Sequence, residues 1–285
     1  MFTPIVVPLD GSALAERAIS YASTLAWTLN GRLILFRALS HGESKPEAEA
    51  SLSRLSEELA AGGVPAQTEV VFGEAAAGIA EMAEAERNSL IVMSTHGRSG
   101  LGRWLYGSVA DEVLHHAGVP VILVSLGCDR AWPLDRPLRV LAPVDGSELS
   151  EQALASISQL AGSLRAELTL LHVLGPPVYA SADTLAERPA NLESAVEAAA
   201  TYLKELGRRT QPGATPPEVR VLVGHPSSAI ASTARRENAD LVAMATHGSG
   251  GFNRTRLGSV ATITVQQASV PTLLLSPTML ARPKE

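Results

Sequence analysis

The sequence predicts an α/β protein built from two tandem, open, mainly parallel five-stranded sheets flanked by helices. An internal repeat is the first observation that predicts this fold class. The second is that short apolar runs alternate with stretches of helical periodicity in each half. The third is that a glycine-rich loop follows an apolar run at the matching place in both halves.

The repeat is carried by two pairs of segments. Residues 4–12, PIVVPLDGS, match residues 139–147, RVLAPVDGS, and residues 95–97, THG, match residues 246–248. The second half has 16 extra residues between these landmarks, and Pro-Pro near 176–191 indicates a longer loop there. We therefore expect a first domain over 1–128, a linker over 129–137, a second domain over 138–277 and a tail over 278–285. The linker has two prolines and four charges, typical of an exposed connection, with Trp132 as a residue able to dock on a surface.

Each half reads as alternating strands and helices. In the first half we predict strands over 5–8, 32–39, 67–72, 90–93 and 119–124, and helices over 14–29, 47–61, 75–86 and 108–117. Strands alternating with helices give a parallel sheet covered on both faces. Ligands bind such sheets outside the carboxyl ends of the strands. Asp10 and the glycine loop both follow strands, so we expect them at one edge.

Composition excludes several classes. The 285 residues are 46% apolar and only 4% aromatic, and the formal net charge is −6 without a long basic run, which argues against nucleic-acid binding. The single cysteine, Cys128, excludes an internal disulfide. No signal peptide or membrane-spanning run is visible, so the expectation is a cytoplasmic protein with no membrane association.

The glycine loop itself predicts an anion site. Residues 94–108, STHGRSGLGRWLYGS, lie between an apolar run and a predicted helix, so backbone N–H groups and a helix N-terminus can surround a phosphate.

Three motifs of the chain carry a family resemblance. These are Pro-x-Asp-Gly-Ser, then Thr-His-Gly followed after nine residues by Gly-Ser, and a final strand of the Val-Pro-Val type. In these motifs the chain resembles the universal stress protein family. The resemblance is a tandem pair that covers nearly the whole chain. It implies an adenine nucleotide alpha hydrolase-like fold. It also implies that the last strands, 119–124 and 270–275, pair within the chain as a pseudo-dimer, and it leaves a further homodimer of chains open.

The resemblance also implies an ATP site, with or without Mg²⁺, in each half. Nucleotide-binding members carry Gly, two residues, Gly, nine residues, then Gly-Ser or Gly-Thr, whereas Ser94 and Ala245 replace the first glycine here. Asp10 and Asp145 fall at the adenine end, and the backbones of Ala38 and Val173 meet the base. The implied ATP-binding residues are Asp10, Ala38, Gly97, Arg98, Gly107, Ser108 and Val109 in the first half, and Asp145, Val173, Gly248, Gly258, Ser259 and Val260 in the second.

Structural explanations of the same residues stay open. Gly97 and Gly107 can serve as turn residues, Ser108 with Asp111 fits a capping box, and Asp10 can cap a helix. Thr262 stands where the second half would need the acid of that box, which favours a ligand role for the hydroxyl. A carboxylate buried at a strand end needs a donor, which an adenine amino group supplies.

The histidines and arginines of the loops have alternatives too. His96 and His247 lack partners at metal-ligand spacing, so we expect loop histidines bonded to backbone and no metal site. Arg98 and Arg103 either neutralise phosphate or are solvated loop charges.

Motifs for catalysis are absent: the sequence has no P-loop, no Gly-x-Ser-x-Gly and no cysteine in a catalytic motif. The expected function is ATP or adenine-nucleotide binding in a stress-response protein, acting through ligand-dependent conformation or association. Two alternatives remain: a nucleotide-free interaction scaffold and a slow ATP hydrolase.

Overall fold

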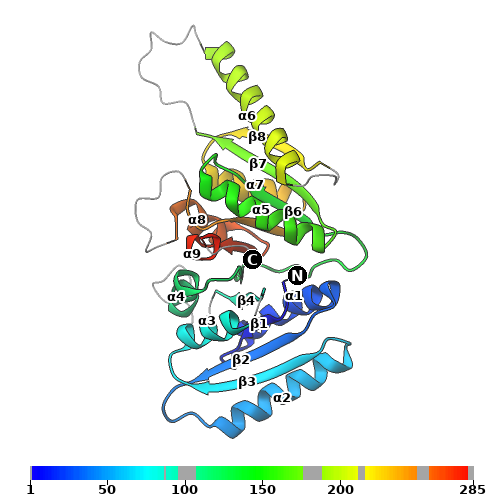
Figure 1. The fold of residues 1–285 in the computed structure, drawn as a ribbon, viewed down its shortest axis with the longest axis vertical. Helices are drawn as coiled ribbons and strands as arrows, with labels where there is room; N and C mark the ends of the chain where they lie inside the picture. Colours follow the sequence, from blue (N-terminus) through cyan, green and yellow to red (C-terminus); the bar gives the residue numbers. More distant parts are fainter. Residues whose placement is uncertain are drawn as a thin grey trace.

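The computed structural model describes residues 2–86, 88–95, 107–175, 188–210, 216–248 and 257–281. The two halves stack along the long axis of the molecule, the first half below the second in Figure 1. The predicted Gly97 and Arg98, with Arg103 and His96, lie outside the described residues.

Each half contains five strands that alternate with helices. The first half has β1 (Ile5–Pro8), α1 (Ala13–Leu29), β2 (Leu33–Leu39), α2 (Lys45–Ala61), β3 (Ala66–Phe72), α3 (Ala75–Ala85), β4 (Leu90–Ser94), α4 (Ser108–His116) and β5 (Val121–Val124). The second has β6 (Arg139–Pro143), α5 (Glu148–Ser163), β7 (Glu167–Leu174), α6 (Arg188–Thr210), β8 (Glu218–Val223), α7 (Pro226–Arg236), β9 (Leu241–Ala245), α8 (Ser259–Gln267), β10 (Thr272–Leu275) and α9 (Pro277–Leu280). The elements predicted for the first half are confirmed, with ends that differ by no more than two residues.

The two five-stranded units join into one sheet. The strand order is β3-β2-β1-β4-β5-β10-β9-β6-β7-β8, parallel throughout except where β5 meets β10 antiparallel. Thr272 pairs with Leu123, and Leu273 with Ile122. The implied pairing of the last strands is therefore confirmed, and it joins the two five-stranded units into one ten-stranded sheet.

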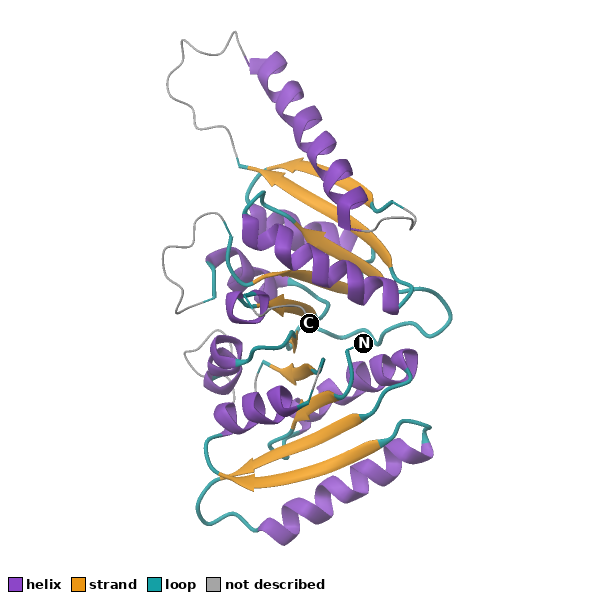
Figure 2. Ribbon diagram, viewed as in Figure 1, coloured by secondary structure: helices purple, strands orange, loops and turns teal. Residues whose placement is uncertain are grey.

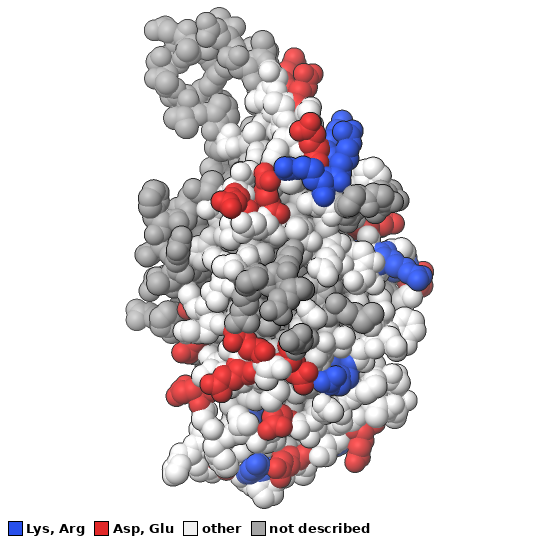
Figure 3. Space-filling view, in the orientation of Figure 1, with Lys and Arg blue, Asp and Glu red and all other residues white. Residues whose placement is uncertain are grey.

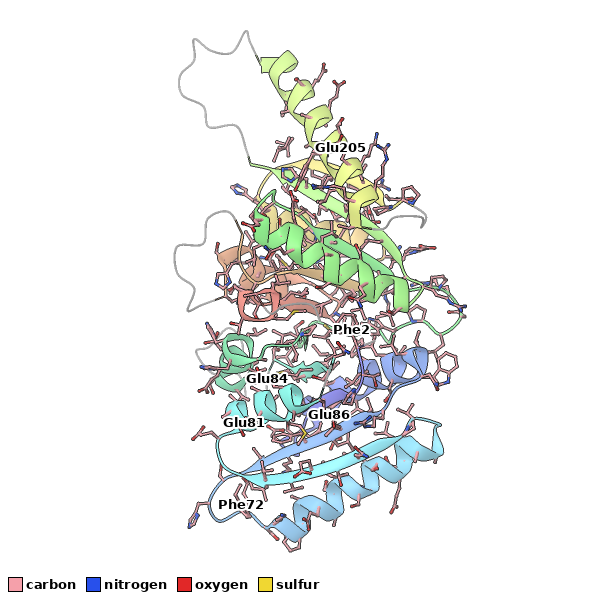
Figure 4. All side chains as sticks on the ribbon, viewed as in Figure 1. Phe2, Phe72, Glu81, Glu84, Glu86 and Glu205 are labelled. Carbon is pink, nitrogen blue, oxygen red and sulfur yellow. The ribbon has the colours of Figure 1, made fainter. Side chains whose placement is uncertain are left out.

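Helices cover both faces of this sheet, as Figure 2 shows. One apolar core packs α1, α2, α5, α6 and α9 against the sheet, and a second core packs α3, α4, α7 and α8 against its other face. Both faces of a parallel sheet need such cover because both are apolar. Phe36 in β2 is among the largest fully buried side chains. The side chains of Figure 4 fill both spaces between helices and strands.

The connection between the halves is mostly exposed, as predicted, but it is anchored. Trp132 is only 5% exposed, and its ring meets that of Tyr21 edge-on with the ring centroids 5.3 Å apart. Its Nε1 donates to the Asp240 carbonyl oxygen at 2.7 Å. The Arg136 guanidinium binds the buried Asp240 carboxylate at 2.7 and 2.9 Å. The connection thus ties α1 of the first half to the start of β9 in the second.

Two other boundaries differ from expectation. The longer loop expected near 176–191 includes the start of a helix, because α6 begins at Arg188. α9 begins at Pro277 and runs into the expected tail, where Met279 and Leu280 pack on the first core.

Candidate functional site

A cavity opens at the carboxyl ends of the strands in each half. The first pocket, of about 270 Å³, is lined by Asp10, Ala38, Gly107, Ser108 and Val109 together with Phe36, Met93, Ser94 and other residues. The second pocket, of about 390 Å³, is lined by Asp145, Val173, Gly248, Gly258, Ser259 and Val260 with Leu171, Met244, Ala245 and others. Every predicted site residue that the structure describes therefore lines the pocket of its own half. These volumes lie near the lower end of the roughly 300–1,000 Å³ usual for ligand pockets.

The strand order explains why residues far apart in sequence meet. β1 lies between β2 and β4, so the turn after β1, the end of β2 and the loop after β4 converge. In the second half β6 lies between β7 and β9 in the same way. The floor of each pocket is apolar and its rim is polar, as in many small-molecule sites.

Helix N-termini face both pockets without side-chain caps. The first residues of α3 and α4, Ala75 and Ser108, line the first pocket, and neither helix has a side-chain cap hydrogen bond. The same holds for α7 and α8, whose first residues are Pro226 and Ser259. The first N–H groups of a helix lack intrahelical partners and favour negative charge. Both pockets therefore offer backbone donors to an anion.

The capping-box explanation of Ser108 is wrong. Gly107 is the N-cap of α4, so Ser108 is the first helical residue and its side chain does not cap. Gly258 and Ser259 take the same two places at α8. The repeated Gly-Ser thus puts an exposed hydroxyl, not a cap, at each helix start.

Backbone contacts close the base of each loop, and at Gly258 they leave no room for a side chain. The Gly107 N–H donates to the Thr95 carbonyl at 2.6 Å, and the Gly258 N–H to the Thr246 carbonyl at 2.8 Å. A β-carbon on Gly258 would lie 2.9 Å from that carbonyl oxygen. The loops that leave β4 and β9 are therefore closed at their base by one backbone hydrogen bond each.

The aspartates organise the turns that follow β1 and β6. Asp10 Oδ1 accepts from the Ser12 amide at 2.9 Å and hydroxyl at 2.6 Å, while Ser12 caps α1. Asp145 Oδ1 accepts from Ser147 at 3.0 and 2.6 Å in the same geometry. Asp10, for which a buried carboxylate was considered, is only half-buried, and Asp145 is exposed. The cap belongs to Ser12 and Ser147, and the aspartates hold these serines in place.

His115, His116 and His247 have local partners. His115 and His116 approach the carbonyl oxygens of Asp111 and Glu112 through Nδ1. His247 Nδ1 lies 2.9 Å from the Thr246 hydroxyl. The described residues contain no group of three or more His, Cys, Asp or Glu side chains arranged to hold a metal.

Sequence reasoning missed two residues beside the pockets. Arg37 precedes Ala38 in β2, and His172 precedes Val173 in β7. His172 lines the second pocket, with Nδ1 2.7 Å from the Val144 carbonyl oxygen. Its ring lies 6.4 Å from that of Tyr202, whose hydroxyl donates to Glu151 at 2.8 Å. Burial, followed by this bond to Glu151, raises the pKa of Tyr202. A polar residue at the end of an otherwise apolar strand was the available signal.

Comparison with known proteins settles the family. The family model described as the universal stress protein family matches residues 1–125 and 138–276. The chain belongs to the universal stress protein family. Universal stress protein Rv2005c of Mycobacterium tuberculosis is 29% identical over 247 residues, which are 86% of this chain and 76% of that protein. A universal stress protein of Mycolicibacterium smegmatis is 30% identical over 203 residues, 66% of this chain and 62% of that protein.

Solved structures support the same fold. A universal stress protein from Archaeoglobus fulgidus superimposes with a TM-score of 0.64 at 20% identity, covering 95% of both chains. Protein PA1789 of Pseudomonas aeruginosa gives a TM-score of 0.71 at 20% identity, covering 97% of this chain and 93% of that one. The two halves are thus two universal-stress-type units with the adenine nucleotide alpha hydrolase-like fold. None of the helices in the described ranges is both long and apolar enough to span a bilayer.

Proposed function

We propose that this universal stress protein binds an adenine nucleotide, ATP above all, in each of its two pockets. The observation that carries the proposal is the repeated juxtaposition of an apolar cavity, a carboxylate at its rim and uncapped helix N-termini. An adenine ring is flat and apolar on its faces, with an amino donor on its edge, and a polyphosphate needs donors. The apolar cavity of each pocket suits the adenine ring, and the helix N-termini at its rim suit the polyphosphate.

The local donors matter because the surroundings are not basic. The chain carries a formal net charge of −6. On the face shown in Figure 3, acidic side chains gather over the first half, where Figure 4 labels Glu81, Glu84 and Glu86 in and just after α3. Phosphate binding would then depend on the N–H groups of the helix N-termini and on cationic groups at the pockets themselves. A positive potential over the surrounding surface would not contribute.

The proposed role is binding, not turnover. Fast phosphoryl transfer needs positioned groups around the transferring phosphate. The carboxylates of Asp10 and Asp145 are engaged with Ser12 and Ser147 through Oδ1. Occupancy of the two pockets, which share one continuous sheet, would bias conformation or association of the chain.

Acid substitutions at the helix starts test the proposal. Ser108→Asp and Ser259→Asp place an exposed acid in the first turn of α4 or α8, where it favours the helix by about 0.3–1 kcal/mol. The same charge repels a phosphate by about 1–4 kcal/mol at 4 Å, depending on the local dielectric. Each variant should therefore weaken ATP binding at its own pocket by at least about fivefold while leaving adenosine binding unchanged.

Ser108→Ala and Ser259→Ala are the matched controls, because they remove the hydroxyl without adding charge. Titration calorimetry with ATP and with adenosine gives both affinities. Unchanged ATP affinity in both acid variants, or no ATP binding to the parent protein, would reject the proposal and favour an interaction scaffold.

A further inference from the structure

Arg37 is a cation without enough partners. Its side chain is 12% exposed, and its Nε is buried with no hydrogen-bond partner. Among the described residues its ion-pair partner is Glu43, at 3.5 Å from the Arg37 terminal nitrogen to Oε1. A guanidinium has five N–H donors, and a buried donor left unpaired is costly. The Nε donor of Arg37 therefore has no acceptor within the described residues, and Glu43 alone pairs with the terminal nitrogens by charge.

The guanidinium packs on Gly11, in the turn next to Asp10 at the rim of the first pocket. A β-carbon on Gly11 would be 2.9 Å from the Arg37 Nη1 atom, so the cation packs on the turn that carries Asp10. Asp10 lines the pocket, and so does Ala38, the residue after Arg37. β2 and β4 lie on opposite sides of β1, so the cation approaches from the side away from the loop that leads to α4.

The residue of the second half that matches Arg37 is not an arginine or lysine. His172 occupies the matching place, and its Nδ1 lies 2.7 Å from the Val144 carbonyl oxygen. Since a carbonyl only accepts, that ring nitrogen carries the hydrogen and its donor is used. Gly146, the counterpart of Gly11, faces open space. The two pockets thus differ in charge at the same point.

We propose that Arg37 binds an anionic group on the sugar side of the ligand in the first pocket. This inference rests on the proposed function and refines its ligand class: an adenine nucleotide that carries a phosphate on the 2′ or 3′ oxygen besides its 5′ phosphate. The 5′ phosphate meets the N-terminus of α4, and the second phosphate meets Arg37. The second pocket makes no such selection.

The test uses the full chain with Ser259→Asp, which weakens phosphate binding at the second pocket. Calorimetry compares AMP with adenosine 2′,5′-bisphosphate and adenosine 3′,5′-bisphosphate, and ATP serves as the reference. A charge-assisted bond to phosphate should make one bisphosphate bind at least about tenfold more tightly than AMP. Arg37→Gln should reduce that preference to about twofold or less, and Arg37→Lys should retain part of it, as a point charge does.

Glu43→Gln is the control for an indirect effect, because it removes the charge of the ion-pair partner and keeps an amide oxygen. The preference should survive it. ATP binding without any bisphosphate preference, or a preference that persists in Arg37→Gln, overturns this inference alone. Equal losses for AMP and both bisphosphates in Arg37→Gln also overturn it, since Arg37 would then contact a neutral part of the ligand. Absence of ATP binding to the parent rejects the proposed function and this inference with it.

Discussion

The Asp145 carboxylate lies directly against Gly248. A β-carbon on Gly248 would overlap Asp145 Oδ2, well inside van der Waals contact. One residue follows β6 and the other follows β9, so this contact joins two walls of the second pocket. Only a residue without a side chain fits there while Asp145 keeps its bonds to Ser147.

Gly248→Ala should therefore displace the Asp145 carboxylate and weaken nucleotide binding at the second pocket, by about tenfold if one charge-assisted hydrogen bond is lost. Gly175→Ala is the matched control, because Gly175 lines the same pocket and a β-carbon there meets nothing within 4 Å. Calorimetry in a Ser108→Asp background isolates this pocket. Equal affinity in Gly248→Ala and the control would mean that Asp145 has no part in binding.

Asp240 should be a strong determinant of stability. Its side chain is 1% exposed, and it accepts from Arg136 and from the Arg139 amide at 2.8 Å. Asp240→Ala leaves these donors unpaired, and we expect a loss of about 2–4 kcal/mol in the free energy of unfolding, measured with urea. Glu167→Ala removes an exposed partner of Arg139 and should cost less than about 1 kcal/mol. Similar losses in both variants would contradict the special role of the buried carboxylate.

The ionisation of Tyr21 makes the free energy of unfolding depend on pH in the alkaline range. Burial, reinforced by the charge of Cys128, raises the pKa of Tyr21 from 10.0 to about 12. Between these values the unfolded chain loses the phenol proton while the folded chain keeps it. The contribution is therefore fully present below pH 10 and is lost as the pH rises toward 12.

Tyr21→Phe should flatten the fall of the unfolding free energy over that interval. At neutral pH it should cost about 1 kcal/mol, because the hydrogen bond from Tyr21 to the Arg130 carbonyl is lost. Urea titrations across the pH range provide the measurement. If the unfolding free energy falls with pH equally in Tyr21→Phe and in the parent protein, Tyr21 has the same pKa in the folded and the unfolded chain.

Thr264 offers a stabilising substitution. It is fully buried in α8, and its hydroxyl has no hydrogen-bond partner among the described residues. Thr264→Val keeps the shape and removes the unsatisfied group, so the free energy of unfolding should rise by about 1 kcal/mol. A loss of stability in the urea titration would show that the hydroxyl has a partner, such as water, in solution.

The order of elements was predictable because it rests on local patterns and on the repeat. The strand-end rule predicted that Asp10 and the glycine loop meet, and the family resemblance implied the other pocket residues. Asp10, Ser108 and Val109 line one cavity as the strand-end rule requires. The cap of α4 was not predictable in detail, since Gly107 and Ser108 are both common near helix starts and only backbone angles decide between them.

Properties that depend on tertiary contacts could not be read from the sequence. The exposure of Asp145 follows from the position of its turn on the surface. The joining of two sheets into one depends on edge strands β5 and β10 facing each other, which only the family resemblance suggested. Arg37 could have been noticed as a charge at the end of an apolar strand, but its contact with the turn at Gly11 could not be read from the sequence.

The most direct test is the number of nucleotides that the protein holds. The purified chain would be saturated with ATP, freed of unbound ligand and denatured, and the released nucleotide identified by mass and quantified per chain. Two ATP per chain are expected in the saturated parent. When loading is at an ATP concentration near the parent's dissociation constant, Ser108→Asp and Ser259→Asp should each hold less ATP per chain than the parent. No released nucleotide, together with no thermal shift on adding ATP with Mg²⁺, would contradict nucleotide binding in both pockets.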